Sequence, residues 1–397
     1  MKKSFIDELI CRQEGFDRLS RDRLEKRQLE LLNTQLRRAR ALSTFYRSYP
    51  ERLETLDDLA RLPLIGADTL RDRFSGLCLL PGSELVRLRT SGTTGRPKRV
   101  AYSRYDCDRT LAFFAAGLTE LIGPGDRVIA AFPRTDRYSL GGLIEDAVKE
   151  IGAGCVCMTG METYRELADL VMKENSSVYL GPPILLLSLL RILDGRSPLQ
   201  RALVSGDTCP LGVAEECEKR LGSRLFPHYG LRESGLGGAM SCSAHEGMHI
   251  RENDLFFEVI GPEGQRLPEG EWGELVLTSM GMDAMPLFRY RTGDCGRLLP
   301  GPCACGSQVK RLETKGRIGN HDAARRDDAV FRHGPVVDLI VENETLRVLT
   351  LKEEERVRAA LEAEYPGMKV LVSRLTNEDA PFFRGKRNGA GTDGRER

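Results

Sequence analysis

A run of hydroxyl, glycine and basic residues over positions 89–98 (RTSGTTGRPK) is the stretch of the sequence best suited to chemistry. Glycine allows positive φ and a close approach of the backbone to a ligand, so backbone N–H groups and hydroxyls can converge as donors on phosphate oxygens. Lys98 adds a positive charge, and the Gly-Lys-Ser/Thr order of a Walker loop is missing. The run predicts a phosphate-binding loop, and a polar hairpin turn is the alternative. Its hydroxyl and glycine members are Thr90, Ser91, Gly92, Thr93, Thr94 and Gly95.

Two shorter motifs with charged and turn-forming residues follow. The first, over positions 229–234 (YGLRES), offers the carboxylate of Glu233, and Mg²⁺ prefers hard oxygen ligands shared between protein and phosphate. The second, over positions 289–294 (RYRTGD), ends in Asp294 and is followed by a Gly-Arg pair that ends at Arg317. Each motif alone also fits an ordinary strand-to-loop corner or a turn.

Cysteine and histidine spacing suggests a metal site. Cys242 and His249 form a Cys-x₆-His pair, and Cys303 and Cys305 lie in a Gly/Pro-rich turn. Three thiolates and one imidazole form a tetrahedral structural zinc site that leaves no open catalytic position. His245 is the alternative nitrogen ligand, and four unrelated residues are the alternative to a site. The chain has 11 Cys and lacks an apparent export signal, so a disulfide framework is not expected.

The elements expected before about residue 254 alternate between helices and short apolar strands, which favours a layered α/β domain with parallel strands. Beyond residue 254, short strands separated by Gly and Pro turns predict antiparallel structure, either a small barrel or a sheet. We expect helices over 22–43, 105–122 and 140–151, and strands over 84–90, 127–132, 155–158, 255–260, 273–278 and 296–299.

The C-terminal part is expected to form a compact α+β unit. A polar, charge-rich stretch from residue 318 to 328 is interpreted as a linker. Beyond it we expect a hairpin over 336–342 and 345–350, a helix over 352–365 and a last strand over 369–375. The tail from Gly389 has no apolar residue to bury and is expected to be disordered.

Composition limits the possible partners. The 397-residue chain has 59 Lys and Arg against 58 Asp and Glu, so neither nucleic acid nor an anionic membrane is expected as a partner. The most apolar stretch, 184–190, is too short to span a bilayer. A cytoplasmic location is therefore expected.

The three motifs, in this order along the chain, resemble those of the acyl-CoA synthetase, adenylation-domain and luciferase superfamily. The resemblance implies that the 90–98 loop holds the β- and γ-phosphates of ATP, that Tyr229 packs on adenine beside Gly230, and that Glu233 holds Mg²⁺. It also implies that Asp294 and Arg317 contact the ribose, and Gly206 is assigned to the same nucleotide site. Arg232 is a departure, because the superfamily usually has a Thr there that contacts the α-phosphate. Arg232 is assigned to the catalytic set with Glu233 as a stronger contact to that phosphate, and an arginine that blocks the site is the alternative.

Longer stretches resemble the phenylacetate–CoA ligase branch of this superfamily. They include positions 36–50 (LRRARALSTFYRSYP), 136–156 (DRYSLGGLIEDAVKEIGAGCV) and the run from Gly247 to Ser307, and the resemblance covers about residues 30 to 317. It implies that Tyr138, Gly141 and Gly142 lie near the acyl pocket. Similar Cys and His positions in this branch support the zinc site.

The resemblance also implies a division into two domains and a reaction. Residues 1–317 would form the adenylate-forming domain and 318–397 a reduced C-terminal domain, with Gly319 in place of the usual hinge Asp. Lys386, in a PFFRGK segment, matches the catalytic lysine. The expected reaction is activation of a carboxylic acid, aryl or arylacetic, to acyl-AMP and then transfer to CoA. A different acceptor and a non-catalytic nucleotide-binding relative are the alternatives, and a homodimer is compatible with either.

Overall fold

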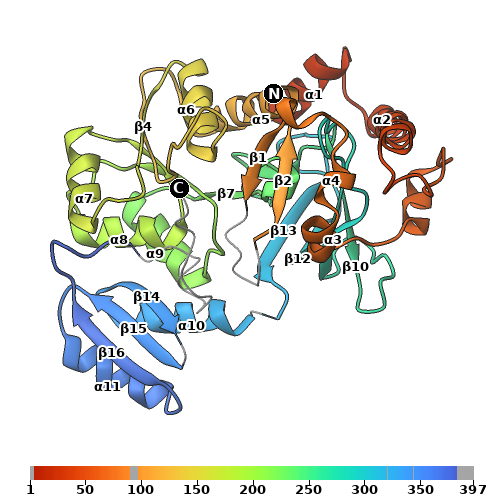
Figure 1. Ribbon diagram of the computed structural model, residues 1–397. Coiled ribbons are helices and arrows are strands. Elements are labelled where there is room, and N and C mark those ends of the chain that lie inside the picture. The colour runs from red at the N-terminus through yellow and green to blue at the C-terminus, as the bar shows by residue number, and fades with distance from the viewer. Residues whose placement is uncertain (1–3, 90–96, 320, 343, 382–397) are drawn as a thin grey trace. The chain divides into compact units, whose positions relative to one another are not determined.

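The structure is a computed structural model that describes residues 4–89, 97–319, 321–342 and 344–381 (Figure 1). The chain forms two compact units that are each assembled from separate stretches of sequence. Of the described residues, the first unit contains 4–89, 97–120 and 226–318, and the second contains 121–225 and those from 319 to 381. Residues 121–225 belong to the same unit as the C-terminal part, and the division into two domains at residue 317 stays a prediction.

Helices make up most of the N-terminal part of the first unit. The predicted amphipathic helix over 22–43 is confirmed by α2, which begins after Ser20, whose side chain accepts a hydrogen bond from the backbone N–H of Arg23. Leu24, Leu32 and Leu36 on one face of α2 are fully buried. The helices are α1 (Phe5–Glu14), α2 (Arg21–Leu42), η1 (Leu56–Arg61), α3 (Ala67–Asp72), α4 (Phe74–Leu77), η2 (Gly82–Glu84) and α5 (Arg104–Leu118).

Antiparallel strands form the rest of the first unit. Strands β1 (Val86–Arg89) and β2 (Arg99–Tyr102) pair on either side of the loop sequence at 90–96. A larger sheet has the order β10-β11-β12-β13-β9-β8-β7, which confirms antiparallel structure beyond residue 254. The described strands show no pairing that closes this sheet into the predicted barrel. Its strands are β7 (Phe226–Tyr229), β8 (Ala239–Ser241), β9 (Met248–Ile250), β10 (Leu255–Ile260), β11 (Gly273–Ser279), β12 (Tyr290–Leu299) and β13 (Arg311–Arg317).

Parallel strands form the centre of the second unit, which confirms the α/β prediction for this region. Their order is β6-β5-β3-β4, and a helix lies in each connection between strands that follow one another in sequence. Helix α6 packs on β3 and β4, and α8 packs on β5. The elements are β3 (Arg127–Ala130), α6 (Leu140–Glu150), β4 (Gly154–Cys157), α7 (Tyr164–Lys173), β5 (Val178–Gly181), α8 (Pro183–Leu193), β6 (Arg201–Val204) and α9 (Leu211–Leu221).

The C-terminal part of the second unit has the predicted hairpin, helix and last strand. Strands β14 (Val336–Glu342) and β15 (Thr345–Thr350) are antiparallel, and β16 (Lys369–Arg374) runs parallel to β15 with α11 (Glu354–Glu364) packed on it. The prediction of a linker over 318–328 was wrong, because α10 (His321–Arg332) is a helix there. Ala323, Val330 and Phe331 are buried, so tertiary packing stabilises a segment whose composition is polar.

The C-terminal part docks on α8 through apolar side chains. Helix α8 is apolar except for Ser188 and Arg191, and side chains from α10 and β14 belong to the same buried cluster as its leucines. Arg191 of α8 is 6% exposed and donates to the carbonyl oxygens of Phe331 and Val336. Ser188 likewise donates to the carbonyl of Val337. A continuous core within this unit therefore joins α8 to α10 and β14.

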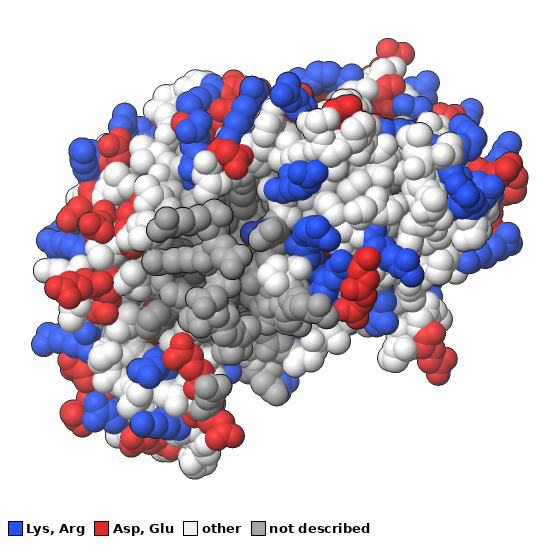
Figure 2. Space-filling model, in the orientation of Figure 1, with Lys and Arg blue, Asp and Glu red and all other residues white. Residues whose placement is uncertain are grey.

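None of the helices in the described residues is both long enough and apolar enough to cross a membrane. Figure 2 shows Lys and Arg interspersed with Asp and Glu over one face of the molecule.

Candidate active site

Lys98, Tyr290 and Glu233 form a buried polar cluster in the first unit. Lys98 Nζ lies 2.5 Å from Glu233 Oε1 and donates a 2.9 Å hydrogen bond to the Tyr290 hydroxyl. That hydroxyl donates in turn to Glu233 Oε1 over 2.9 Å. The Lys98 side chain is 12% exposed and that of Glu233 4%. Three motifs separated in sequence therefore meet through one cation, one phenol and one carboxylate.

The cluster keeps its acid ionised and its phenol neutral. Burial alone would raise the pKa of Glu233, but the Lys98 charge and the hydrogen bonds from Lys98 and Tyr290 lower that pKa below its ordinary value. Burial and the neighbouring Glu233 charge raise the pKa of Tyr290. Glu233 therefore presents a charged oxygen in a protected environment. Sequence reasoning missed Tyr290, because nothing in its motif indicates that its hydroxyl reaches Lys98.

Tyr229, Asp294 and Arg317 form a second polar group in the same unit. The Tyr229 hydroxyl donates a 2.8 Å hydrogen bond to Asp294 Oδ2, and Arg317 Nε lies 3.2 Å from Asp294 Oδ1. The antiparallel register of β12 and β13 sets Asp294 opposite Arg317. Burial, followed by the Asp294 charge, raises the pKa of Tyr229. The structure thus brings together three side chains that the sequence assigned to one nucleotide.

Gly230 and Arg232 lie in the turn after β7. A Cβ on Gly230 would lie 2.0 Å from the carbonyl oxygen of Leu236, so a side chain does not fit there. Arg232 begins the short helix η3 (Arg232–Ser234), and its buried Nη1 has no hydrogen-bond partner in the described structure. Burial lowers the pKa of Arg232, and the Glu233 charge partly counteracts this. A buried guanidinium nitrogen without a partner is costly, and an anionic oxygen would satisfy it.

The predicted acyl-pocket residues lie in the second unit. Tyr138 is half-buried in the loop before α6, and Gly141 and Gly142 are in the first turn of that helix. A Cβ would lie 2.6 Å from the carbonyl oxygen of Phe132 at Gly141, and 2.3 Å from that of Asp136 at Gly142. Close packing of the 132–137 loop on α6 therefore explains both glycines without a ligand.

Of the remaining residues predicted to bind the nucleotide or to be catalytic, the structure describes Gly206 but not Lys386 or the loop at 90–95. Gly206, also in the second unit, follows β6 with a φ of +81°, a conformation that favours glycine. Lys386 lies outside the described residues, as do Thr90, Ser91, Gly92, Thr93, Thr94 and Gly95.

Cys242, His249, Cys303 and Cys305 form a compact cluster in the first unit. Their ligand atoms all lie within 4.8 Å of one another. Cys242 Sγ is 3.8 Å from Cys303 Sγ, and Cys305 Sγ is 3.4 Å from His249 Nε2. His249 lies on β9, and the turn between β12 and β13 carries Cys303 and Cys305. Long-range strand pairing therefore assembles the set that the sequence spacing suggested.

The donor set of this cluster fits a tetrahedral zinc ion. A hydrogen bond from Cys242 and the neighbouring His249 lower the pKa of the Cys305 thiol, although burial opposes the shift. A thiolate, which is the form that binds metal, is therefore favoured at Cys305. His245 is not part of the four-residue group and instead packs against the Phe226 ring at 4.5 Å. The alternative assignment of His245 as the nitrogen ligand was therefore wrong, and His249 supplies the imidazole of the cluster.

Comparison with known proteins agrees with the geometry. Residues 86–283 match the family model of the AMP-binding enzyme. The chain is 31% identical over 354 residues to a phenylacetate–coenzyme A ligase of Pseudomonas putida, covering 84% of this chain and 77% of that protein. The chain belongs to the phenylacetate–coenzyme A ligase family of AMP-binding enzymes.

A second curated relative and a solved structure agree with this family assignment. It is 30% identical over 280 residues to the phenylacetate–coenzyme A ligase of Escherichia coli K12, covering 66% of this chain and 63% of that protein. A crystal structure of a 2-hydroxyisobutyryl-CoA ligase in the postadenylation state superposes with a TM-score of 0.73 at 19% identity, covering 91% of this chain and 88% of that one. The mixed α/β fold with large sheets is thus the fold of adenylate-forming enzymes, and the chain is an AMP-forming ligase.

Proposed function

We propose that this ligase uses ATP to activate an aryl or arylacetic acid as its acyl-AMP, with release of pyrophosphate, and then transfers the acyl group to CoA. Relatives of similar length named as phenylacetate–coenzyme A ligases support the acid class and the acceptor. The observation that carries the proposal is the Lys98–Tyr290–Glu233 cluster. It joins the end of the phosphate loop to both later motifs. Three unrelated turns would not be expected to bring a cation, a phenol and a carboxylate together in this way.

Adenylation requires negative charge to be stabilised as it develops. A carboxylate oxygen of the acid attacks the α-phosphorus, a P–O bond forms, and the bond to the pyrophosphate oxygen breaks. Fixed cations and N–H donors aimed at these oxygens are the main catalytic resource for such a reaction. In the proposal the 90–98 loop holds the leaving pyrophosphate and Arg232 faces the α-phosphate. Lys386 bridges that phosphate and the attacking carboxylate.

The two acidic residues of the motifs have separate proposed roles. Glu233 is ionised and buried, which suits a hard oxygen ligand of Mg²⁺, and that ion would neutralise phosphate charge when bound. Asp294 would accept hydrogen bonds from the ribose hydroxyls. Arg317 and Tyr229 hold the Asp294 carboxylate from both oxygens, which supports a role in positioning it.

The proposal also assigns roles to the two parts of the chain and to the remaining predicted site residues. Residues 1–317 act as the adenylate-forming part and 318–397 as the C-terminal part, with Gly206 at the nucleotide and Tyr138, Gly141 and Gly142 bordering the acyl group. The Cys₃His cluster holds a structural zinc ion. A cytoplasmic location, a homodimer and a barrel-like arrangement of part of the antiparallel sheet complete the proposal.

Product analysis tests the proposed reaction. The purified chain is incubated with MgATP, CoA and one acid from a panel of benzoic, phenylacetic and short aliphatic acids, and AMP and thioester are quantified by chromatography. The proposal predicts AMP and acyl-CoA in equal amounts with an aryl or arylacetic acid. AMP without thioester would indicate another acceptor, and the absence of AMP with every acid would favour a non-catalytic relative.

A further inference from the structure

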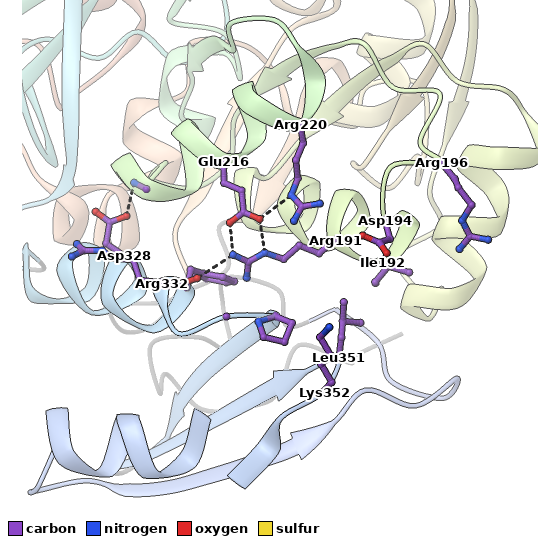
Figure 3. A pocket seen from close by; sticks show the side chains of 14 residues that line it. Arg191, Ile192, Asp194, Arg196, Glu216, Arg220, Asp328, Arg332, Leu351 and Lys352 are labelled. Atoms are coloured by element: carbon purple, nitrogen blue, oxygen red, sulfur yellow. Dashed lines mark hydrogen bonds and ion pairs between the residues drawn. The ribbon is translucent and has the colours of Figure 1, made fainter. Parts of the chain in front are cut away.

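A hollow of about 650 Å³ lies within the second unit, and none of the described residues that line it is assigned above to the ligase reaction (Figure 3). The end of α8 and one face of α9 line one side of it. The other side is lined by α10 and by residues 334–335 and 351–352, which lie just before β14 and just after β15. We call it the basic hollow and define it by Arg191, Arg196, Arg220, Arg332 and Lys352. Its volume is within the range of small-molecule sites.

Ion pairs and backbone contacts fix one wall of the basic hollow. Figure 3 shows Glu216 of α9 between Arg191 and Arg220. Arg191 Nε lies 3.0 Å and Arg220 Nε 2.8 Å from the same carboxylate oxygen, Glu216 Oε1. Arg191 also donates to backbone carbonyls of the C-terminal part. Since these donors are held in place, this wall is preorganised and keeps a local excess of positive charge.

Unused cations line the opposite wall. The exposed side chains of Arg332 and Lys352 make no hydrogen bond or ion pair with any residue that the structure describes. On the side of α8, Arg196 donates one 3.3 Å hydrogen bond to the carbonyl oxygen of Leu193. The lining as a whole has five cationic and three acidic side chains. Two of the three acids are already engaged, Glu216 with two arginines and Asp328 with the backbone N–H of Gly212.

Apolar surface lies beside these charges. Ile192, Phe331, Pro335 and Leu351 contribute to the lining. A ligand that combines negative charge with an apolar or planar portion would use both parts. Arginine suits phosphate oxygens because its planar fork donates two parallel hydrogen bonds. An excess of cations at an apolar wall therefore favours an organic phosphate over a simple halide.

We propose that the basic hollow binds a phosphate-bearing small molecule, with Arg332 and Lys352 as its principal contacts. The inference does not depend on the adenylation reaction, because none of these side chains has a role in it. Both walls would contact the ligand, so binding would also strengthen the docking of the C-terminal part on α8 and α9. Free phosphate and the phosphate of a nucleotide such as CoA share this chemistry, and the experiment separates them.

Isothermal titration of the full chain with CoA, dephospho-CoA and inorganic phosphate tests the proposal. Arg332→Gln/Lys352→Gln is compared with Arg165→Gln/Lys173→Gln, which removes the same charge from exposed positions on α7 outside the hollow. The double variant in the hollow is expected to bind at least one probe about tenfold or more weakly than wild type, and the α7 variant to bind like wild type. The charge-conserving Arg332→Lys/Lys352→Arg is expected to retain binding.

The probes identify the ligand class. A loss confined to CoA assigns the site to its 3′-phosphate, which dephospho-CoA lacks, and an equal loss with both assigns it to the shared pyrophosphate. A loss with inorganic phosphate assigns it to free phosphate. Equal affinities of the hollow and α7 variants for all three probes, with circular dichroism showing both folded, would overturn the proposal.

Discussion

Lys98 Nζ lies 2.5 Å from Glu233 Oε1, and both side chains are almost completely buried. The pair joins the residue directly before β2 to the turn that follows β7. A buried ion pair is expensive to form, but it is more expensive to break by removing one partner, because the other charge is then left uncompensated. The interaction can therefore be measured by comparing the stability of single and double variants of the pair.

Removing one partner is therefore expected to destabilise the protein more than removing both. Lys98→Met should lower the free energy of unfolding by about 3–5 kcal/mol, because it leaves Glu233 buried without its cation. Adding Glu233→Leu should restore part of that loss. Urea unfolding of the two single variants and the double variant measures the coupling. Additive losses would show that the two side chains do not interact in solution.

The same pair predicts a dependence of stability on pH. Because folding lowers the pKa of Glu233 below its ordinary value of 4.5, its contribution is present above that pH and is lost as the pH falls through the lower folded pKa. The stability difference between wild type and Glu233→Gln should thus be largest near neutral pH and shrink in acid. Glu313→Gln, which removes a carboxylate that is 37% exposed and paired with Arg297, is the comparison variant. A constant gap for Glu233→Gln would contradict the assignment.

Arg317 is expected to act on the nucleotide through Asp294. Arg317→Gln removes the charge that holds Asp294 Oδ1, so the KM for ATP should rise about tenfold, the size of a hydrogen bond to a charged group. Arg291→Gln is the matched control, because Arg291 is 54% exposed and pairs with Glu274. Initial rates of pyrophosphate release against ATP concentration provide the comparison. A similar KM for both variants would remove Arg317 from the nucleotide site.

The thiol–imidazole cluster predicts a bound metal. Elemental analysis of the purified protein is expected to find about one zinc ion per chain, and a chelator should lower the melting temperature, because a structural zinc site contributes directly to folding. Cys305→Ser should lose the ion, and Cys295→Ser, at a thiol outside the cluster, should retain it. Wild-type protein that contains no zinc and melts identically with and without chelator would refute the site.

Local signals predicted most elements but not how they meet. Periodic apolar residues gave α2 to within a residue or two, and alternating elements gave the parallel sheet. The segment 318–328 was misinterpreted because it is polar and charged, whereas its helical state depends on burying Val330 and Phe331 in the core around α8. Composition describes a segment alone and does not include the surface on which it packs.

In the candidate site, too, local motifs predicted individual residues but not the long-range contacts between them. Motif order identified Glu233, Asp294 and Arg317, since these residue types have defined chemistry in nucleotide sites. The role of Tyr290 depends on a contact between β12 and Lys98 that no local pattern encodes. His249 was separable from His245 only in the fold, where pairing of β9 with β13 carries it to the three thiols.

ATP–pyrophosphate exchange tests the central claim most directly, because it reports acyl-AMP formation whatever the acceptor. Purified wild-type protein is assayed with labelled pyrophosphate, MgATP and each acid of the aryl, arylacetic and aliphatic panel, beside Glu233→Gln as the impaired control. The proposed function predicts exchange that depends on an aryl or arylacetic acid and falls at least a hundredfold in the variant, by analogy with the loss of one charge-stabilising group. Folded wild-type protein that exchanges no label with any acid would contradict it.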